Sequence, residues 1–401
     1  MYQYGCIRTA FFMSRYFNTI HTAVALVNNY TGEKPFIFFL KNYFSQNKKH
    51  GSQDRKLISE LCYNYFRTGH CFNHADEKNL AAAFFMCQHT GHPLLEELYP
   101  HLNEAVHFSI NEKAKIVNID LQKIFPFRSI LSEQLNTNEF SNSLLKQPKL
   151  FLRCRPNKKE IVQQKLQAKQ IEYEVLDEDC ICLSNKTGTQ DIILLNKEAV
   201  IQDYRSQQVF NIGFNLLQSL PFKNKLNVWD CCAASGGKSI LLYDILQGQI
   251  FITASDIRSS ILKNMQTRLK EAGIKLQHTF TADLTENKGI HKQDKYDIII
   301  LDAPCSGSGT WGRTPEQLYF FNENILAHYS QKQLQIASQV ASQLRENGLL
   351  FYITCSVFKS ENEEMVRAIE KQTSLKCIEY KYLPGWRVGA DTLFTSVFQK
   401  E

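Results

Sequence analysis

The stretch YDIIILDAPCSGSGTWGRTPE, residues 296–316, runs from an apolar segment straight into an acid, a proline and a cysteine. A second stretch of the same form, LLFYITCSVFKSENEE, ends its apolar segment at Cys355. Buried strands of an α/β sheet carry their ligand-binding groups at the carboxyl ends. Two thiols at two such ends, Cys305 and Cys355, therefore indicate a shared chemical task.

The segments after Gln202 alternate between strand and helix patterns. The expected strands are LNVWDCC, IFITASD, YDIIILDAP and LLFYITCS, and the expected helices are GKSILLYDILQ, SSILKNMQTRLKEAG and NILAHYSQKQLQIASQVASQLRENG. This alternation predicts βαβ units and a mostly parallel, doubly wound, Rossmann-like sheet with helices on both faces. Ligands of such sheets bind beyond the carboxyl ends of the strands. The unusual residues stand there: Asp230, Asp256, Asp302 and Cys355.

Length and charge bound the protein class. The 401 residues exceed what one hydrophobic core usually organises, so about two or three domains are expected. A formal net charge of +6 permits a polyanionic partner without requiring one. The 12 cysteines are scattered and no signal peptide is evident, which favours reduced thiols in a cytoplasm. No apolar run approaches the roughly 20 residues that span a bilayer, so no membrane partner is expected.

Composition divides the chain into parts. Residues 1–145 repeat apolar residues at helical spacing, as in GSQDRKLISELCYNYFRTGH, and predict an α-helical domain. Residues 146–200 predict a small α+β module, with CICLSN and DIILLN among its strands, and residues 201–401 hold the alternating sheet. Between Lys146 and Lys169 the module has eight basic residues and one acid. A charge run alone is usually a solvated helix face.

The loop DCCAASGGKS, residues 230–239, joins a strand to a helix through small residues that let backbone approach a ligand. A P-loop needs glycine where Cys232 stands, which disfavours an NTPase, and the dinucleotide pattern G-x-G-x-x-G is absent. S-adenosylmethionine (SAM) remains, with the expected contacts Cys232, Ala233, Ala234, Ser235, Gly236, Gly237 and Lys238. Asp256 is expected to accept from the ribose hydroxyls and Asp283 to hold the adenine end. Either acid alone would more simply be a cap, but with Asp230 and Asp302 they favour a cofactor site.

Two thiols and an acid fit the methylation of cytosine at C5. That carbon is too weak a nucleophile to take a methyl group, but a thiolate that adds at C6 turns the ring into an enamine that can. An acid near N3 must neutralise the developing charge, and a base must then remove the C5 proton so that the thiol can leave. Asp302, Cys305 and Cys355 match this list, although a single cysteine is ordinarily a buried inert thiol.

The motifs DAPCSGSG, TCS followed by ENEE, and CAASGGKS resemble those of the RsmB/Nop2/Sun family of SAM-dependent RNA cytosine-C5 methyltransferases. The resemblance runs from Gln202 to the C-terminus, about half the chain. VIQDYRSQ is similar to the family's VQD motif, and GADTLF to its DGFF strand. Thr392 stands where the family usually has glycine, and Ser235 where it usually has proline. Neither departure removes a chemical group.

The resemblance implies a role for each reactive residue. Cys355 of the TCS motif is the expected nucleophile, Cys305 of the PCSG motif assists breakdown of the covalent adduct, and Asp302 contacts N3. Spacing alone does not assign these roles, because DNA cytosine methyltransferases place their nucleophile in a Pro-Cys motif like Pro304-Cys305. No metal is expected.

For the front half the resemblance implies a NusB-like RNA-binding domain followed by a small RNA-contacting module. The basic residues of the module become candidate phosphate contacts: Lys146, Lys149, Arg153, Arg155, Lys158 and Lys159. Arg313 is expected to hold the target nucleotide, with a plain surface arginine as the alternative. Ribosomal RNA, with a flipped or single-stranded base, is the expected substrate. A tRNA target and a non-catalytic ribosome-assembly role are the alternatives, and a monomer is favoured.

Overall fold

The chain divides into two units in this computed structural model, which describes residues 15–220, 225–286 and 295–401. The helical unit contains the described residues up to Pro126, together with Leu144–Lys146 and Thr314–Phe321. The sheet unit contains Phe127–Ser143, Gln147–Arg313 and Asn322–Glu401 as far as they are described. Among the described residues, no helix is long and apolar enough to cross a membrane.

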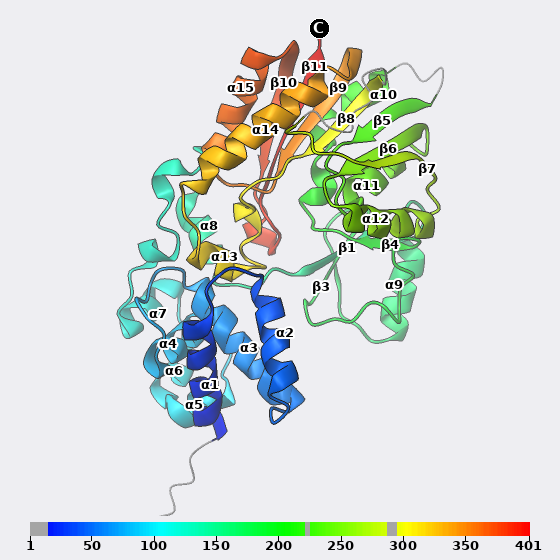
Figure 1. Cartoon of the computed structure of the whole chain (residues 1–401). Coiled ribbons are helices and arrows are strands. Elements are labelled where there is room, and N and C mark those ends of the chain that lie inside the picture. Colours follow the sequence, from blue (N-terminus) through cyan, green and yellow to red (C-terminus); the bar gives the residue numbers. More distant parts are fainter. Residues whose placement is uncertain (1–14, 221–224, 287–294) are drawn as a thin grey trace, which may run out of the picture. The chain divides into compact units, whose positions relative to one another are not determined.

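The helical unit is built from short helices, drawn in blue to cyan in Figure 1, and one later segment. They are α1 (Arg15–Asn29), α2 (Phe36–Gln46), α3 (Ser52–Arg67), α4 (Glu77–Cys87), α5 (Pro93–Leu98), α6 (Pro100–Glu104), α7 (Ile110–Val117) and α13 (Pro315–Tyr319). The α3 residues Ile58, Leu61 and Tyr65 are buried, as the helical spacing predicts. Ser109 and Glu112 close the start of α7 with a reciprocal capping box.

Helix α13 belongs to the helical unit although it follows the PCSG motif in sequence. Glu316 Oε1 accepts a hydrogen bond from the backbone N–H of Phe36 at 3.3 Å. The rings of Tyr319 and Phe66 lie 5.5 Å apart, edge to face. An aromatic contact and a buried backbone partner hold α13 against α2 and α3. The domain boundaries drawn from composition did not include this return of the chain.

Near residue 145 the chain passes between the helical unit and the sheet unit more than once. Helix α8 (Thr137–Ser143) lies in the sheet unit, and Leu144–Lys146 return to the helical unit. There Arg67 Nη1 donates to the carbonyls of Leu144 and Lys146, both at 3.2 Å.

The sheet unit contains a seven-stranded sheet in the order β10-β11-β9-β8-β5-β6-β7. Its strands are β5 (Leu226–Asp230), β6 (Ile250–Asp256), β7 (Leu276–Thr281), β8 (Tyr296–Asp302), β9 (Leu344–Thr354), β10 (Leu375–Leu383) and β11 (Leu393–Lys400). Neighbours from β9 to β7 are parallel, and β11 pairs antiparallel with β9 and β10. The predicted fold class, a mostly parallel Rossmann-like sheet, is confirmed.

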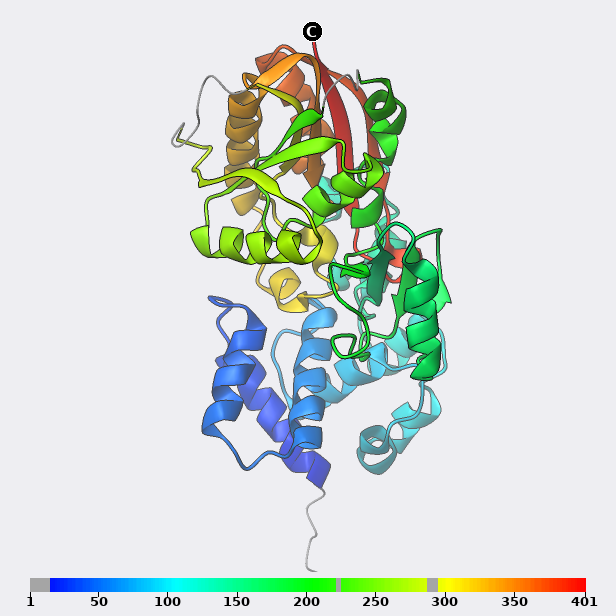
Figure 2. The same ribbon diagram turned by 90° about the vertical axis from the view of Figure 1, so that its right-hand side faces the viewer.

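Helices cover both faces of this sheet, as Figures 1 and 2 show. They are α10 (Phe214–Ser219), α11 (Gly237–Ile245), α12 (Ser259–Glu271), α14 (Ile325–Ala341) and α15 (Glu363–Gln372). The core under α10, α11 and α12 joins Leu217, Ile240 and Leu269 to the strand residues Val228 and Ile298. This two-sided packing leaves the carboxyl ends of β5, β6, β8 and β9 as a common edge.

The small α+β module forms a separate four-stranded antiparallel sheet in the order β2-β3-β1-β4. It comprises β1 (Leu150–Cys154), β2 (Glu174–Val175), β3 (Cys180–Leu183) and β4 (Ala199–Ile201), with α9 (Lys159–Ala168). The prediction of a strand at DIILLN is wrong. The Glu198 carboxylate accepts from Leu194 N at 2.9 Å and Asn196 has a left-handed φ of 66°, so the segment turns instead.

Candidate active site

A cavity of about 260 Å³ opens at the carboxyl ends of β5, β8 and β9. Its lining includes two predicted reactive residues, Asp302 and Cys355, and several of the predicted cofactor contacts: Ala233, Ala234, Ser235, Gly237 and Lys238. We call it the strand-end cavity. Lys238 Nζ and Asp302 Oδ2 lie 2.5 Å apart across it. Burial lowers the pKa of Lys238, but the attraction of Asp302 outweighs burial and holds that pKa above its ordinary value.

The glycine loop after β5 is shaped by its small residues. Gly236 has a left-handed φ of 79°, and a Cβ there would lie 2.7 Å from Leu269 and 2.9 Å from Met265. Ala234 adopts φ 44°. Arg268 Nη1 donates to Ser235 Oγ at 2.9 Å, so a hydrogen bond holds the position where proline was expected. The loop thus brings its backbone to the start of α11, where N–H groups are free of intrahelical partners.

The two acids assigned to the ends of the cofactor are held by their own neighbours. Asp256 Oδ2 accepts from Ala234 N at 3.0 Å, and both carboxylate oxygens accept from the Arg258 side chain. Burial raises the pKa of Asp256, but hydrogen bonds from Arg258 outweigh it and the net pKa is lowered. Asp283 Oδ1 accepts from the N–H and hydroxyl of Thr285. Among the described residues, neither acid lines the strand-end cavity.

Asp230 is the most buried acid of this edge. Ser239 Oγ donates to its Oδ2 at 2.6 Å, while its Oδ1 is buried and has no hydrogen-bond partner among the residues that the structure describes. Burial raises the pKa of Asp230 to about 7, and the nearby Asp302 adds to this shift. An unpaired acceptor beside the glycine loop fits a ligand that brings hydroxyl or amino donors, as SAM does.

Asp230→Asn is expected to change how the free energy of unfolding depends on pH. The folded-state pKa of about 7 exceeds the ordinary 3.8, so stability is lost as pH rises from about 4 to about 7. The variant lacks this loss and should gain about 4 kcal/mol relative to the native protein between pH 4 and pH 8. Thermal unfolding followed by circular dichroism at both pH values measures it. Equal differences at the two pH values would contradict the buried acid.

The Sγ atoms of the two cysteines lie 3.4 Å apart, and of the two only Cys355 lines the strand-end cavity. The hydrogen bond to Cys355, together with burial, raises the pKa of Cys305 well above its ordinary value. Cys355 and Lys238 both line the strand-end cavity, and a charge on Cys355 is one of the influences that would raise the pKa of that ammonium. The thiol whose pKa is raised is therefore Cys305, and Lys238 is the cation near the partner thiol Cys355.

Residues 217–390 match the family model described as 16S rRNA methyltransferase RsmB/F. This segment is an RsmB/F methyltransferase domain. The resemblance inferred from the motifs is confirmed.

Two relatives illustrate the extent of the likeness. "Probable ribosomal RNA small subunit methyltransferase B" of Bacillus subtilis is 29% identical over 199 residues, which are 50% of this chain and 43% of that protein. The match therefore spans less than half of that relative. "Ribosomal RNA small subunit methyltransferase B" of Shewanella oneidensis is 26% identical over 372 residues, 82% of this chain and 85% of that protein.

Two crystal structures share the fold. The protein PH0851 superposes with a TM-score of 0.66 at 18% identity and covers 95% of this chain and 98% of its own. NSun6 from Pyrococcus horikoshii with SFG superposes with a TM-score of 0.57 at 14% identity, covering 67% of this chain and 96% of its own.

Arg313 of the RsmB/F domain is bound by two acids that the sequence analysis did not single out. Its Nη2 lies 2.8 Å from Asp203 Oδ2, and its Nε lies 2.8 Å from Asp391 Oδ2. Burial and the charge of Asp203 raise the pKa of Asp391 to about 7 despite Arg313. Both acids line the strand-end cavity. They lie in the VIQDYRSQ and GADTLF motifs, so the motifs were the signal that pointed to them.

The structure corrects the expectation that Arg153 and Arg155 contact RNA phosphates. Both residues are buried, and both guanidinium groups pair with Asp244 of α11, at 2.6 and 2.9 Å. Both guanidinium groups are thus held inside the protein, and breaking such a buried ion pair leaves an uncompensated charge. These arginines instead join β1 of the module to the RsmB/F domain. Because successive side chains of an extended segment point to opposite faces, Arg153 and Arg155, two positions apart, share the buried face.

The lysines of the module are more open. Lys149 is exposed and lies 3.2 Å from Glu174, while Lys158 and Lys159 are half-buried at the start of α9. Their positions leave the expected phosphate contacts of these lysines as a prediction.

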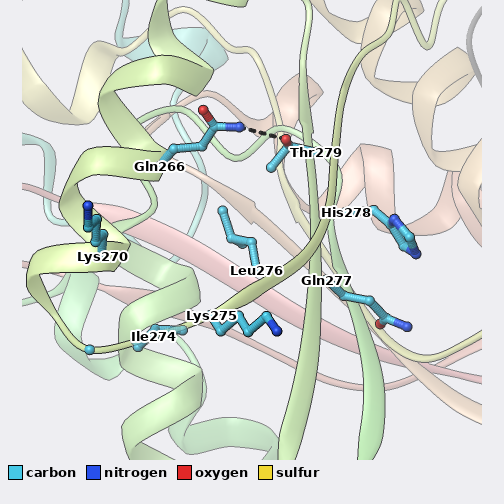
Figure 3. Close-up of a pocket in the computed structure, with 9 residues that line it drawn as sticks. Gln266, Lys270, Ile274, Lys275, Leu276, Gln277, His278 and Thr279 are labelled. Carbon is cyan, nitrogen blue, oxygen red and sulfur yellow. Dashed lines mark hydrogen bonds between the residues drawn. The ribbon is translucent and has the colours of Figure 1, made fainter.

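A second cavity, of about 480 Å³, lies between α12 and the edge strand β7 (Figure 3). Gln266 Nε2 donates to Thr279 Oγ1 at 2.7 Å across its upper part, and Lys270 and Lys275 lie at its border. It contains none of the residues predicted from the motifs. Of these two cavities, only the strand-end cavity is therefore lined by a reactive thiol.

Proposed function

We propose that this chain is a SAM-dependent RNA cytosine-C5 methyltransferase that acts on the RNA of the small ribosomal subunit. The observation that carries the proposal is the pair of thiols at 3.4 Å beside the Lys238–Asp302 pair. Its RsmB/F domain and the names of its relatives support a methyl transfer to ribosomal RNA. A single reactive thiol would serve many reactions, whereas two thiols with an acid match the steps of one.

SAM, when bound, supplies an electrophilic methyl group. The glycine loop would hold it through the backbone of residues 232–237, with Asp230 and Asp302 as acceptors inside the cavity. Asp256 would accept from the ribose hydroxyls, and it also fixes the loop through Ala234 N. Asp283 would hold the adenine end. These contacts follow from the strand ends at which each acid stands.

The chain's own groups would act on the cytosine in order. Cys355 forms a bond to C6 as a thiolate, with the charge of Lys238 nearby. Asp302, in its protonated form, would donate its proton to N3 and so neutralise the charge that develops on the ring, and it would take the proton back when the adduct breaks down. Cys305, whose pKa is raised in the free protein, would first release its own proton to water and would then accept the C5 proton as a thiolate, while the C6–S bond breaks and Cys355 leaves as a thiolate.

RNA binding outside the cavity would use positive charge that does not read sequence. Lys149, Lys158 and Lys159 of the module are the proposed phosphate contacts. Arg313, which is held by Asp203, Asp391 and the Lys149 carbonyl, would contact the target nucleotide, with the helical unit as a further RNA-binding part.

Methyl transfer to small-subunit RNA is expected to yield 5-methylcytidine. Purified protein would be incubated with methyl-labelled SAM and either 16S rRNA or total tRNA, and nucleoside digests would be separated by mass spectrometry. Label in 5-methylcytidine from 16S rRNA supports the proposal. Label in tRNA alone would show that tRNA is the substrate in place of ribosomal RNA. Label in another nucleoside would reject the C5 mechanism. No label in either RNA would favour the non-catalytic assembly role.

A further inference from the structure

Glu361 makes no hydrogen bond to either thiol, although its charge is one of the influences that raise the pKa of Cys305. The Glu361 side chain is fully buried, at 0% exposure, and its carboxylate accepts four hydrogen bonds. Ser306 donates through its backbone N–H at 2.8 Å and its hydroxyl at 2.5 Å, and Ser356 donates through its hydroxyl at 2.5 Å. Gln333 Nε2 donates at 3.0 Å. Ser306 directly follows Cys305 and Ser356 directly follows Cys355, so one carboxylate joins the two reactive loops.

The carboxylate is itself held in place. Tyr352 donates its phenolic hydrogen to the backbone carbonyl of Glu361 at 2.7 Å, and the same hydroxyl lies 3.1 Å from Gln333 Oε1. Four donors fill the acceptor sites of a carboxylate, which is what allows a buried charge to persist. A fully satisfied buried network of this kind is rigid, because displacing one member leaves the others unpaired.

We propose that Glu361 is a positioning residue that keeps Cys305 and Cys355 in contact by holding Ser306 and Ser356. This inference rests on the proposed function for its consequence in turnover. It assigns a role to an acid that reaches no substrate and lies outside the residues lining the strand-end cavity.

The two thiols depend on Glu361 to different degrees. Cys355 has anchors of its own, because Gly309 N donates to the Cys355 carbonyl at 2.8 Å and Asn362 Nδ2 donates to the Ser356 carbonyl at 2.9 Å. Ser306, beside Cys305, takes its backbone N–H and its hydroxyl to Glu361. Loss of the carboxylate should therefore displace Cys305 first, and the step that Cys305 serves should suffer most.

Glu361→Gln is the matched test, because glutamine keeps the shape but presents an NH₂ group to donors. Release of the covalent RNA adduct is expected to slow by about 10- to 100-fold, since small misplacements of reacting groups have effects of this size. The adduct should then accumulate on denaturing gels with SAM and RNA present. KM for RNA and the Kd for SAM should change by less than about threefold, because Glu361 touches neither ligand.

Glu363→Gln is the control. Glu363 lies two residues further on and accepts from Ser132 and Tyr382, without a hydrogen bond to either cysteine loop. The control should lower Tm comparably and release adduct at the native rate. Should Glu361→Gln fail to fold, Ser306→Ala removes one donor and is expected to slow release in the same direction by a smaller factor.

A second measurement needs no RNA or SAM. Diamide takes two electrons and two protons from a thiol pair, which becomes a disulfide while diamide becomes the hydrazine. The Cys305–Cys355 disulfide, identified by peptide mass mapping, should form at least about 10-fold more slowly in Glu361→Gln than in the native protein or the Glu363→Gln control. An unchanged rate of disulfide formation would overturn the positioning role. A native protein that methylates no RNA, but shows the slowed oxidation, would instead reject the proposed function and retain the positioning.

Discussion

Cys355→Ala is expected to abolish both methylation and the protein–RNA adduct, whereas Cys305→Ala should accumulate a denaturant-resistant adduct. Cys355 makes the bond to C6, so its removal ends the reaction at the first step, with a loss of at least about 10³-fold. Cys305 acts after methyl transfer, so the adduct forms but is released slowly. Denaturing gel electrophoresis with labelled RNA, in the presence of SAM, distinguishes the two variants directly.

The double variant and a distant thiol complete the comparison. Removing both cysteines should remove the adduct, because no nucleophile remains. Cys377→Ala, in β10 of the same sheet, should leave methylation and adduct unchanged. The opposite pattern, with adduct trapped by Cys355→Ala alone, would make Cys305 the nucleophile and reverse the roles that the raised pKa of Cys305 supports.

Gly309→Ala is expected to destabilise the sheet unit strongly. A Cβ on Gly309 would lie 1.9 Å from the carbonyl oxygen of Thr392 and 3.0 Å from that of Cys355, both backbone atoms. The two hydrogen bonds that Gly309 makes with these residues, at 2.8 and 3.0 Å, would have to lengthen. Overpacking and two lost hydrogen bonds together predict a loss of about 3 to 5 kcal/mol in the free energy of unfolding. Thermal and urea unfolding measure it.

Gly188→Ala is the control for this substitution. No atom lies within 4 Å of a Cβ built on Gly188, and its φ is not in the left-handed region. The control should be neutral or stabilising by up to about 1 kcal/mol, because alanine lowers the entropy of the unfolded chain. If Gly309→Ala behaved like Gly188→Ala, the close approach of the PCSG motif to Cys355 and Thr392 would be wrong.

The sheet and its reactive edge were predictable because their signals are local. An apolar run of strand length ending in Asp302 or Cys355 carries both the element and the position of its functional group. The glycine loop follows the same logic, since backbone approach needs small residues at that point of the chain. Periodicity and residue type decide such features without knowledge of distant partners.

Features that depend on a partner distant in sequence could not be predicted from the sequence. Arg153 and Arg155 lie in a basic segment of the kind that binds RNA. Only the position of Asp244, distant in sequence, makes them members of a buried ion pair. Glu361 is one of several acids in ENEE, and the burial that singles it out comes from Ser306, in another loop. The amino-acid sequence alone does not show whether a charged side chain will face water or another charged group.

The hydrogen bond between Phe36 N and Glu316 Oε1 joins residues 280 positions apart. During synthesis at roughly 5 to 20 residues per second, the ribosome needs on the order of 15 to 60 seconds to add the intervening chain. Throughout that time α2 and α3 have been made, but the aromatic surface that receives α13 has no partner. Helices α2 and α3 are thus made early but completed late, and they stay exposed to chaperones and proteases until a segment 280 residues further along the chain has been made.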